Sequence, residues 1–272
     1  MTAIFRIVWD AAASFADDDG SALAGHIAFS TLLGLFPFVI LASNIAALVL
    51  GEDRGAEAID QLFLYAPEHI AKTLEPVLRG VLQGSSGSLL TLSAMIAVWF
   101  SSNAFEALRT GFDRAYGGSS HGWVAGRIRS IFSVFIAVIV ALVLSVTIIL
   151  GPLLINVLEA TLAIEVPWVT VLVRYGAGLT VFGIFLLFLH RTLPGHGLRI
   201  GALVPGVVVS ALIWVVAATG FSIYLAYTPT YASTYGALAG VVITLMFFYI
   251  TAMAVLFGAE LNAVLERQRK GN

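Results

Sequence analysis

Six long uncharged stretches constrain this sequence more than any other feature. They are 15 to 28 residues long and together cover 136 of the 272 residues, so all thirty charged side chains lie in the other half of the chain. A helix needs about 20 mostly apolar residues to cross the hydrocarbon core of a bilayer. The stretches are 27–50, 88–105, 131–158, 175–189, 200–227 and 236–258.

The stretches predict helices rather than the strands of a membrane barrel. Lipid offers the backbone no hydrogen-bond partners, so only helices or closed barrels can span it. Barrel strands are about 9–11 residues long and alternate polar with apolar side chains, whereas these stretches are longer and do not alternate. The 15-residue stretch reaches spanning length when it is extended upstream to Pro167, because proline suits the first helical turn. We therefore expect an all-α polytopic membrane protein with six transmembrane helices, the fourth at 167–189.

The two 28-residue stretches, 131–158 and 200–227, are longer than a perpendicular span requires. They are expected to tilt, or to break near Gly151-Pro152 and near Pro205.

Composition excludes several classes of protein. Charged residues make up 11% of the chain and hydrophobic ones 59%, whereas an ordinary soluble domain is about 25% charged. The net charge of −2 provides no overall basic field for a nucleic acid. The chain has no cysteine, and it contains no HExxH zinc motif, GxSxG serine elbow or phosphate-binding loop. We therefore expect no catalytic residues, no metal, no cofactor and no enzymatic activity.

The distribution of lysine and arginine predicts the orientation in the membrane. With both termini in the cytoplasm, the inner segments hold ten of these residues and the outer segments hold four. Cytoplasmic loops carry an excess of such residues, which favours this orientation. The loop 51–87 is then outside, and residues 259–272 form a cytoplasmic tail whose charges are solvated.

Two connecting segments are predicted to be amphipathic helices. Within residues 1–20, apolar side chains including Ile4, Val8 and Trp9 fall near one face, as in a helix that lies flat on the inner leaflet. In the outside loop 51–87, apolar residues follow Pro67 at helical spacing. We expect both to be short interfacial helices beside a single membrane domain.

One cluster of polar residues follows the second span. Asn103 lies just inside the span, and Glu106, Arg109 and Asp113 share one helix face at positions i, i+3 and i+7. Opposite charges at these spacings attract each other. The cluster is interpreted either as a helix end with ordinary ion pairs or as the charged mouth of a polar cavity.

Other polar residues near the spans are further candidates for a transport path. Glu260 and Asn262 lie at the inner end of the last span, where a carboxylate is costly unless it is paired or hydrated. The arginines of the 106–130 connector are its expected partners. Asn44 lies in the first span, and Arg174 lies within the fourth. Together with the cluster above, these residues are expected to surround one cavity if the protein is a transporter.

Pro37 interrupts the first span. A proline removes a backbone hydrogen bond, and broken helices can build transporter sites, although most such prolines only kink the helix. A kink is expected here, with a role in a site as the alternative.

Several motifs together resemble the YihY/virulence factor BrkB family of bacterial inner-membrane proteins. They are AFSTLLGLFP at 28–37, WFSSNAFEALRTGFDRAY at 99–116, LGP at 150–152, YGALAG at 235–240 and GAELNA at 258–263. Phe29-Ser30 departs from the tyrosine pair that is frequent in the family. The resemblance implies a six-helix protein of the bacterial inner membrane. Members have carried the label ribonuclease BN, but this sequence provides neither metal ligands nor a basic path for RNA.

Two functional hypotheses follow. The first is transport or handling of lipid or envelope material, with membrane lipids, an anionic lipid or a small solute as partner, because arginines at the inner face suit anionic headgroups. The second is an accessory envelope protein that binds partners and transports nothing. A membrane-embedded enzyme is a third, weaker hypothesis. A homo-oligomer is compatible with the sequence, but no residue pattern supports one.

Overall fold

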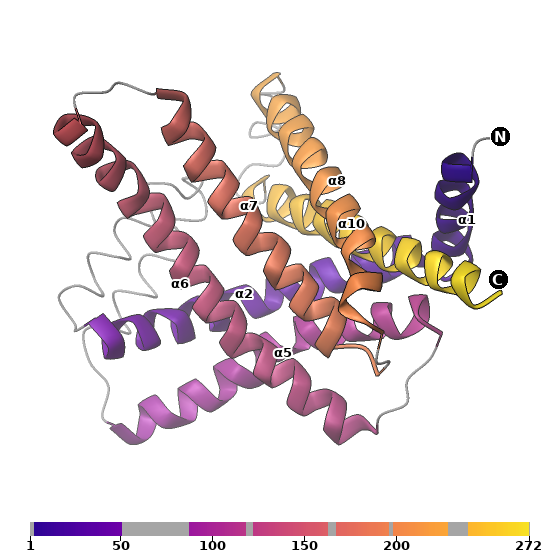
Figure 1. The fold of residues 1–272 in the computed structure, drawn as a ribbon. Helices are drawn as coiled ribbons and strands as arrows, with labels where there is room; N and C mark the ends of the chain where they lie inside the picture. Colours follow the sequence, from indigo (N-terminus) through magenta and orange to yellow (C-terminus); the bar gives the residue numbers. More distant parts are fainter. Residues whose placement is uncertain are drawn as a thin grey trace. The chain divides into compact units, whose positions relative to one another are not determined.

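The computed structural model describes residues 3–50, 87–117, 122–162, 167–195, 198–227 and 239–271. These residues form seven helices (Figure 1): α1 (Ala3–Asp17), α2 (Gly20–Leu50), α5 (Gly87–Ala115), α6 (Trp123–Leu162), α7 (Pro167–Thr192), α8 (Ile200–Tyr227) and α10 (Ala239–Gly271). Side chains are not described for most of 39–50, 87–94, 145–162 and 167–175. The expected amphipathic helix of the outside loop lies outside the described residues.

The helix bounds follow the uncharged stretches closely at some ends and pass beyond them at others. α8 begins and ends where its stretch does, and α7 begins at Pro167, the expected first residue. α5 continues to Ala115 and α6 already begins at Trp123, so both extend into the charged connector between them. The expected tail after residue 258 also continues as helix, within α10.

Neither expected break in the long helices is present. α6 runs without interruption through Gly151-Pro152, and α8 does so through Pro205. α2 likewise continues through Pro37 to Leu50. A single proline removes one hydrogen bond, and the helix continues on both sides of it. The kink at Pro37 stays a prediction.

Exposed apolar side chains identify the environment of these helices. On α8, Val204, Val208, Leu212 and Val216 follow one another at helical spacing and are 43 to 72% exposed. Soluble monomers rarely expose apolar stripes of this kind. Among the described residues, three segments are long and apolar enough to cross a membrane: Trp123–Leu144, Ile200–Leu225 and Ala239–Lys270. The structure is therefore that of an all-α membrane protein.

The chain divides into two compact units. The first unit comprises 1–35, 99–134 and 186–272, and the second comprises 36–98 and 135–185. The first unit contains all of α1, α8 and α10, together with one end each of α2, α5, α6 and α7. The polar networks described below all lie in this first unit.

Close backbone contact joins α8 to α10 in the first unit. A Cβ atom on Gly206 would overlap the carbonyl oxygen of Gly258, and a Cβ atom on Gly258 would overlap the hydroxyl of Ser210. Small residues at such a crossing let two membrane helices pack backbone to backbone. This contact brings the part of α10 around Gly258 against the first turns of α8.

α1 packs along the C-terminal part of α10 (Figure 1). Ala11 of α1 is fully buried against Leu261 and Val264. The opposite face of α1 carries Phe5, 49% exposed, and Trp9, 66% exposed. The helix therefore has one face that packs on the protein and one apolar face that does not.

Candidate functional site

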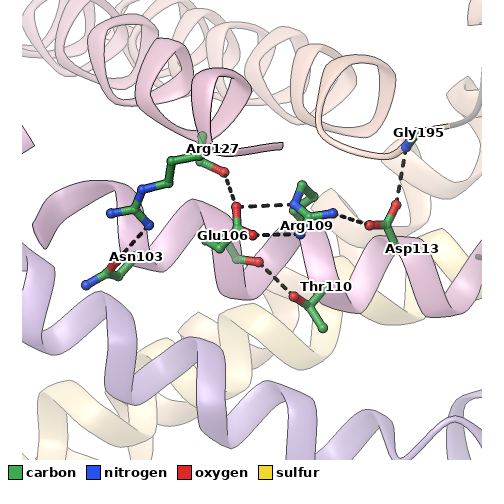
Figure 2. Close-up of polar contacts among 8 residues, drawn as sticks. Asn103, Glu106, Arg109, Thr110, Asp113, Arg127 and Gly195 are labelled. Atoms are coloured by element: carbon green, nitrogen blue, oxygen red, sulfur yellow. Dashed lines mark hydrogen bonds and ion pairs between the residues drawn. The ribbon is translucent and has the colours of Figure 1, made fainter. Parts of the chain in front are cut away.

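The charged residues that share a face of α5 form a continuous set of ion pairs (Figure 2). Arg109 lies between two carboxylates: its Nη2 is 2.6 Å from Oε1 of Glu106, and its Nη1 is 2.5 Å from Oδ2 of Asp113. The three side chains are only 10 to 22% exposed. The attraction expected from their i, i+3 and i+7 spacing is therefore present in the fold.

Side chains from α6 extend this set of ion pairs. Ser130 donates a hydrogen bond to Glu106 at 2.8 Å, and Arg127 donates one to Oδ1 of Asn103 at 2.9 Å. Arg127 also donates to the carbonyl oxygen of Trp99 and stacks over its ring at 3.9 Å from the centroid. We call these residues the α5 network: Asn103, Glu106, Arg109, Asp113, Arg127 and Ser130.

The α5 network also reaches the segment that follows α7. The backbone N–H of Gly195 donates to Oδ1 of Asp113 at 3.2 Å (Figure 2), and Arg129 donates to the carbonyl oxygen of Pro194 at 3.4 Å. The network thus connects α5, α6 and the end of α7. Gly126 leaves space for it, because a Cβ atom there would lie 2.9 Å from Nε of Arg109.

The contacts of the network stabilise the charged forms of its central pair. Burial raises the pKa of Glu106, but the hydrogen bonds from Arg109 and Ser130, together with the charges of Arg109 and Arg127, hold the pKa of this carboxyl below its ordinary value. The hydrogen bond with Glu106 raises the pKa of Arg109 against the opposing effect of burial. Both groups are therefore charged at neutral pH.

A second polar network is centred on Asn262 of α10, which is fully buried. Its Oδ1 accepts a 2.7 Å hydrogen bond from the backbone N–H of Gly206, and its Nδ2 donates to the carbonyl oxygen of Leu203 at 3.0 Å and to the hydroxyl of Tyr116 at 3.4 Å. That hydroxyl also lies 2.8 Å from Nδ1 of His190. Asn262 is thus a buried link between α10, α8 and the end of α5.

Burial is the main influence on the hydroxyl of Tyr116. It raises the pKa of Tyr116 well above its ordinary value, and the nearby Glu260 carboxylate raises it further, while the hydrogen bond with Asn262 acts in the opposite direction. Tyr116 is therefore neutral and serves as a hydrogen-bonding link.

The expected pairing of Glu260 with arginines of the 106–130 connector is not formed. Glu260 is only 3% exposed, and its Oε2 has no hydrogen-bond partner among the described residues. The connector arginines have other partners: Arg109 and Arg127 belong to the α5 network, Arg114 pairs with Asp19 at 3.2 Å, and Arg129 contacts Pro194. The charged groups that act on Glu260 are instead Asp18 and Arg267.

A pocket of about 1050 Å³ lies where α5 and α10 end and α8 begins. Five cationic side chains and two carboxylates line it: Arg114, Arg199, Arg267, Arg269, Lys270, Asp18 and Glu266. Tyr116 and Gly117 also contribute to its wall. We call this cavity the basic pocket, because its wall has a surplus of three positive charges.

The expectation that the polar candidates surround one cavity is not met in the part of the chain that the structure describes. Asn103, Glu106, Arg109 and Asp113 belong to the α5 network, whereas Asn262 belongs to the second network and Oε2 of Glu260 has no hydrogen-bond partner among the described residues. None of these six lines the basic pocket. The side chains of Asn44 and Arg174 lie outside the described residues. Their places in a transport path stay predictions.

Sequence reasoning missed the residues that do line a cavity. Arg269 belongs to the segment expected to be a solvated tail, yet its side chain, although exposed, is part of the pocket wall. Arg199 was predicted only to be one of the ten lysines and arginines on the inner side of the membrane. The single signal that could have indicated them is the concentration of arginines at helix ends on the predicted inner side.

Within the residues that the structure describes, no group of three or more His, Asp or Glu side chains comes together in a way that could hold a metal ion. His190 is 1% exposed and contacts Tyr116 and Phe112, the latter with ring centroids 4.4 Å apart.

Comparison with known proteins identifies the family of the chain. The model of the family described as virulence factor BrkB matches residues 11–272. Similar proteins include the putative ribonuclease-like protein YfkH of Bacillus subtilis, which is 28% identical over 93% of this chain and 92% of that protein. A UPF0761 membrane protein of Azoarcus is 25% identical over 91% of this chain and 61% of that protein, and one of Pseudoalteromonas translucida is 24% identical over 92% and 82%.

No solved structure matches the chain. The family match nevertheless covers nearly its whole length, residues 11–272. The resemblance noted in the sequence is thereby confirmed: the chain belongs to the virulence factor BrkB family of membrane proteins.

Proposed function

We propose that this protein is a multi-pass protein of the bacterial inner membrane that binds and moves an anionic lipid or a small anionic solute without covalent chemistry. The basic pocket is the observation that carries the proposal. It has the volume of a ligand site, about 1050 Å³, and five cations in its wall against two carboxylates. Anionic headgroups are attracted to such clusters at a membrane surface.

The convergence of helix ends in the first unit supports a topology with six spans. Hydrogen bonds join four segments that are expected on the inner side: the N-terminal segment, the end of α5, the end of α7 and the C-terminal part of α10. The bonded pairs are Arg267 with Ser14, Arg114 with Asp19, Tyr116 with His190, and Asn262 with Tyr116. If each of the six long helices crosses once, these segments all lie on one side of the membrane. The lysine and arginine count makes that side the cytoplasm.

α1 supports a position of the basic pocket at the membrane surface. Its exposed face contains Phe5 and Trp9, whose stacked rings have centroids 6.4 Å apart. Aromatic side chains on an amphipathic helix favour the headgroup layer. Asp18, directly after α1, lines the basic pocket, so a helix at this depth would hold the pocket beside lipid headgroups.

An accessory envelope protein is the second candidate, and the α5 network favours it. In that network Glu106, Arg109 and Asp113 pair with one another, and its serine and asparagine bond within it. Ser101 and Ser102 likewise bond backbone carbonyl oxygens, those of Gly34 and Trp99. Contacts of this kind serve the packing of helices, as an accessory protein requires, and need no transported ligand.

Reconstitution in liposomes tests the proposal. The purified full chain is placed in vesicles that contain a labelled anionic phospholipid, and in separate vesicles loaded with anionic solutes. Movement of label across the bilayer should exceed that in protein-free vesicles and in vesicles with an unrelated multi-pass protein. Movement no faster than in these controls, across several lipid classes and solutes, would support the accessory function instead.

Orientation is testable separately, because the chain has no cysteine of its own. A Ser85→Cys variant should react with a membrane-impermeant maleimide from outside the inner membrane, and an Arg269→Cys variant only after permeabilisation. The reverse pattern would overturn the predicted topology.

A further inference from the structure

We infer that the basic pocket binds a phosphate-bearing anion, with Arg199 and Arg269 as its principal contacts. The inference rests on the proposed function, because it names the ligand class of the same pocket. The shared chemistry is a phosphate group, carried either by a lipid headgroup or by a free phosphate compound.

The first step is the charge balance within the pocket wall. Oε1 of Glu266 lies 3.5 Å from Nζ of Lys270. Arg114 donates hydrogen bonds to the carboxylate of Asp19 and to the carbonyl oxygen of Asp18. Arg267 donates one to the hydroxyl of Ser14. For Arg199 and Arg269, the described residues supply neither an ion pair nor a side-chain hydrogen bond. These two guanidinium groups are therefore the part of the surplus charge that a ligand can use.

The second step concerns the position of Arg199. Cations in the last turn of a helix stabilise its dipole, which is an ordinary reason for Arg114 in α5 and for Arg269 and Lys270 in α10. Arg199 instead precedes the first residue of α8, where the dipole disfavours a cation. Helix stability therefore does not explain Arg199, although it lines the pocket.

Membrane topology does not explain Arg199 either. A positive charge in this short connector favours the cytoplasmic side, but Arg191 in the same connector supplies that charge equally well. Arg191 is exposed, and it does not line the pocket. The two arginines thus form a natural matched pair for experiment.

The third step is the chemistry of the cations. Four of the five are arginines, and a planar guanidinium can donate two parallel hydrogen bonds to a phosphate. The volume of about 1050 Å³ exceeds the need of one phosphate ion and has room for a glycerol phosphate headgroup. Tyr116 also lines the pocket, but its hydroxyl already bonds His190 and Asn262.

The test compares two double variants of the full chain in phosphatidylcholine nanodiscs. Arg199→Gln with Arg269→Gln removes two pocket charges, and Arg6→Gln with Arg191→Gln removes two exposed charges outside the pocket. One arm titrates inorganic phosphate and glycerol 3-phosphate, with sulfate and acetate as competitors. The other arm measures retention of phosphatidylglycerol or phosphatidic acid by native mass spectrometry.

The pocket variant should lose at least about tenfold in affinity, because charge-assisted hydrogen bonds are lost, whereas the control variant should bind like the wild type. Loss in the lipid arm alone identifies a headgroup, and loss in the soluble arm alone identifies a free phosphate. Equal affinity of the two double variants, or no phosphate binding by the wild type in either arm, would overturn the inference.

A charge-conserving variant separates binding from damage to the fold. Arg199→Lys with Arg269→Lys keeps both charges but loses the planar forks, so its affinity should fall between those of the wild type and the glutamine variant. Its thermal midpoint should match that of the wild type. Absent flux with intact pocket-dependent binding would overturn the transport proposal alone. Normal flux with equal binding by both double variants would overturn only this inference.

Discussion

The α5 network and the basic pocket are built from the same kinds of charged side chain, but they balance charge differently. In the α5 network, Arg109 is shared by two carboxylates and all three side chains are at most 22% exposed. In the pocket, five cations face two carboxylates, and the Arg114–Asp19 pair beside it is 49 and 73% exposed.

This difference separates residues that hold the fold from residues available to a ligand. A partly buried charge that finds its partner within the protein fixes the helices that carry it, and removing the partner is costly. An accessible surplus charge does not hold helices in place. It attracts anions from solution or from the membrane surface. Closeness to the spans singled out the α5 residues, whereas charge balance distinguishes the wall of the basic pocket.

The largest expected effect comes from breaking the α5 network. Arg109→Ala leaves the Glu106 and Asp113 carboxylates without their main partner, which should cost about 3 kcal/mol of stability because the site is partly buried. Arg114→Ala, which breaks the exposed pair with Asp19, should cost about 0.5 kcal/mol or less. Thermal unfolding in detergent measures both. Equal losses would remove the distinction between the two regions.

Salt should affect the two regions differently. Raising the ionic strength from 0.1 to 1 M shortens the Debye length from about 10 to about 3 Å, so phosphate binding at the basic pocket should weaken by about tenfold. The thermal midpoint of the ligand-free protein should change little, because the contacts of the α5 network are short and partly buried. Salt-independent binding, measured by titration, would contradict an electrostatic pocket.

Tyr116→Phe tests the link between the end of α5, α7 and α10. It removes the hydroxyl that contacts His190 and Asn262, and the loss should be about 1 kcal/mol because both hydrogen bonds join neutral partners. Tyr227, 85% exposed, provides the control as Tyr227→Phe, with an unchanged thermal midpoint. A larger effect at Tyr227 than at Tyr116 would contradict the buried link.

The smallest effect concerns acid. The folded pKa of Glu106 lies below its ordinary value of 4.5, so its contribution to stability is present above that value and is lost as the pH falls through the folded pKa. Glu106→Gln should therefore lower the thermal midpoint at pH 7 and flatten its decline on acidification. The shift is modest because burial opposes the hydrogen bonds. An unaltered acid profile would contradict this role for Glu106.

Local spacing explains which features could be predicted from the sequence. The length and apolarity of α8 and the pairing of Glu106, Arg109 and Asp113 depend on the backbone of a single helix, whose period places i, i+3 and i+4 side chains together. Two expectations went beyond local spacing: the partners of Glu260, which were wrong, and the shared cavity, which stays a prediction. They required knowledge of which helix ends meet, and helical spacing contains no information about that.

By itself, the sequence determined a helical membrane protein, its family and the ion pairs within α5, because lipid excludes unpaired backbone and helical period orders neighbours. The tertiary structure alone decided the contacts at separations of 24, 74 and 146 residues: Asn103 with Arg127, Tyr116 with His190, and Tyr116 with Asn262. It also decided the basic pocket, since four chain segments build its wall. Such contacts depend on how helices pack, and packing is a property of the whole fold.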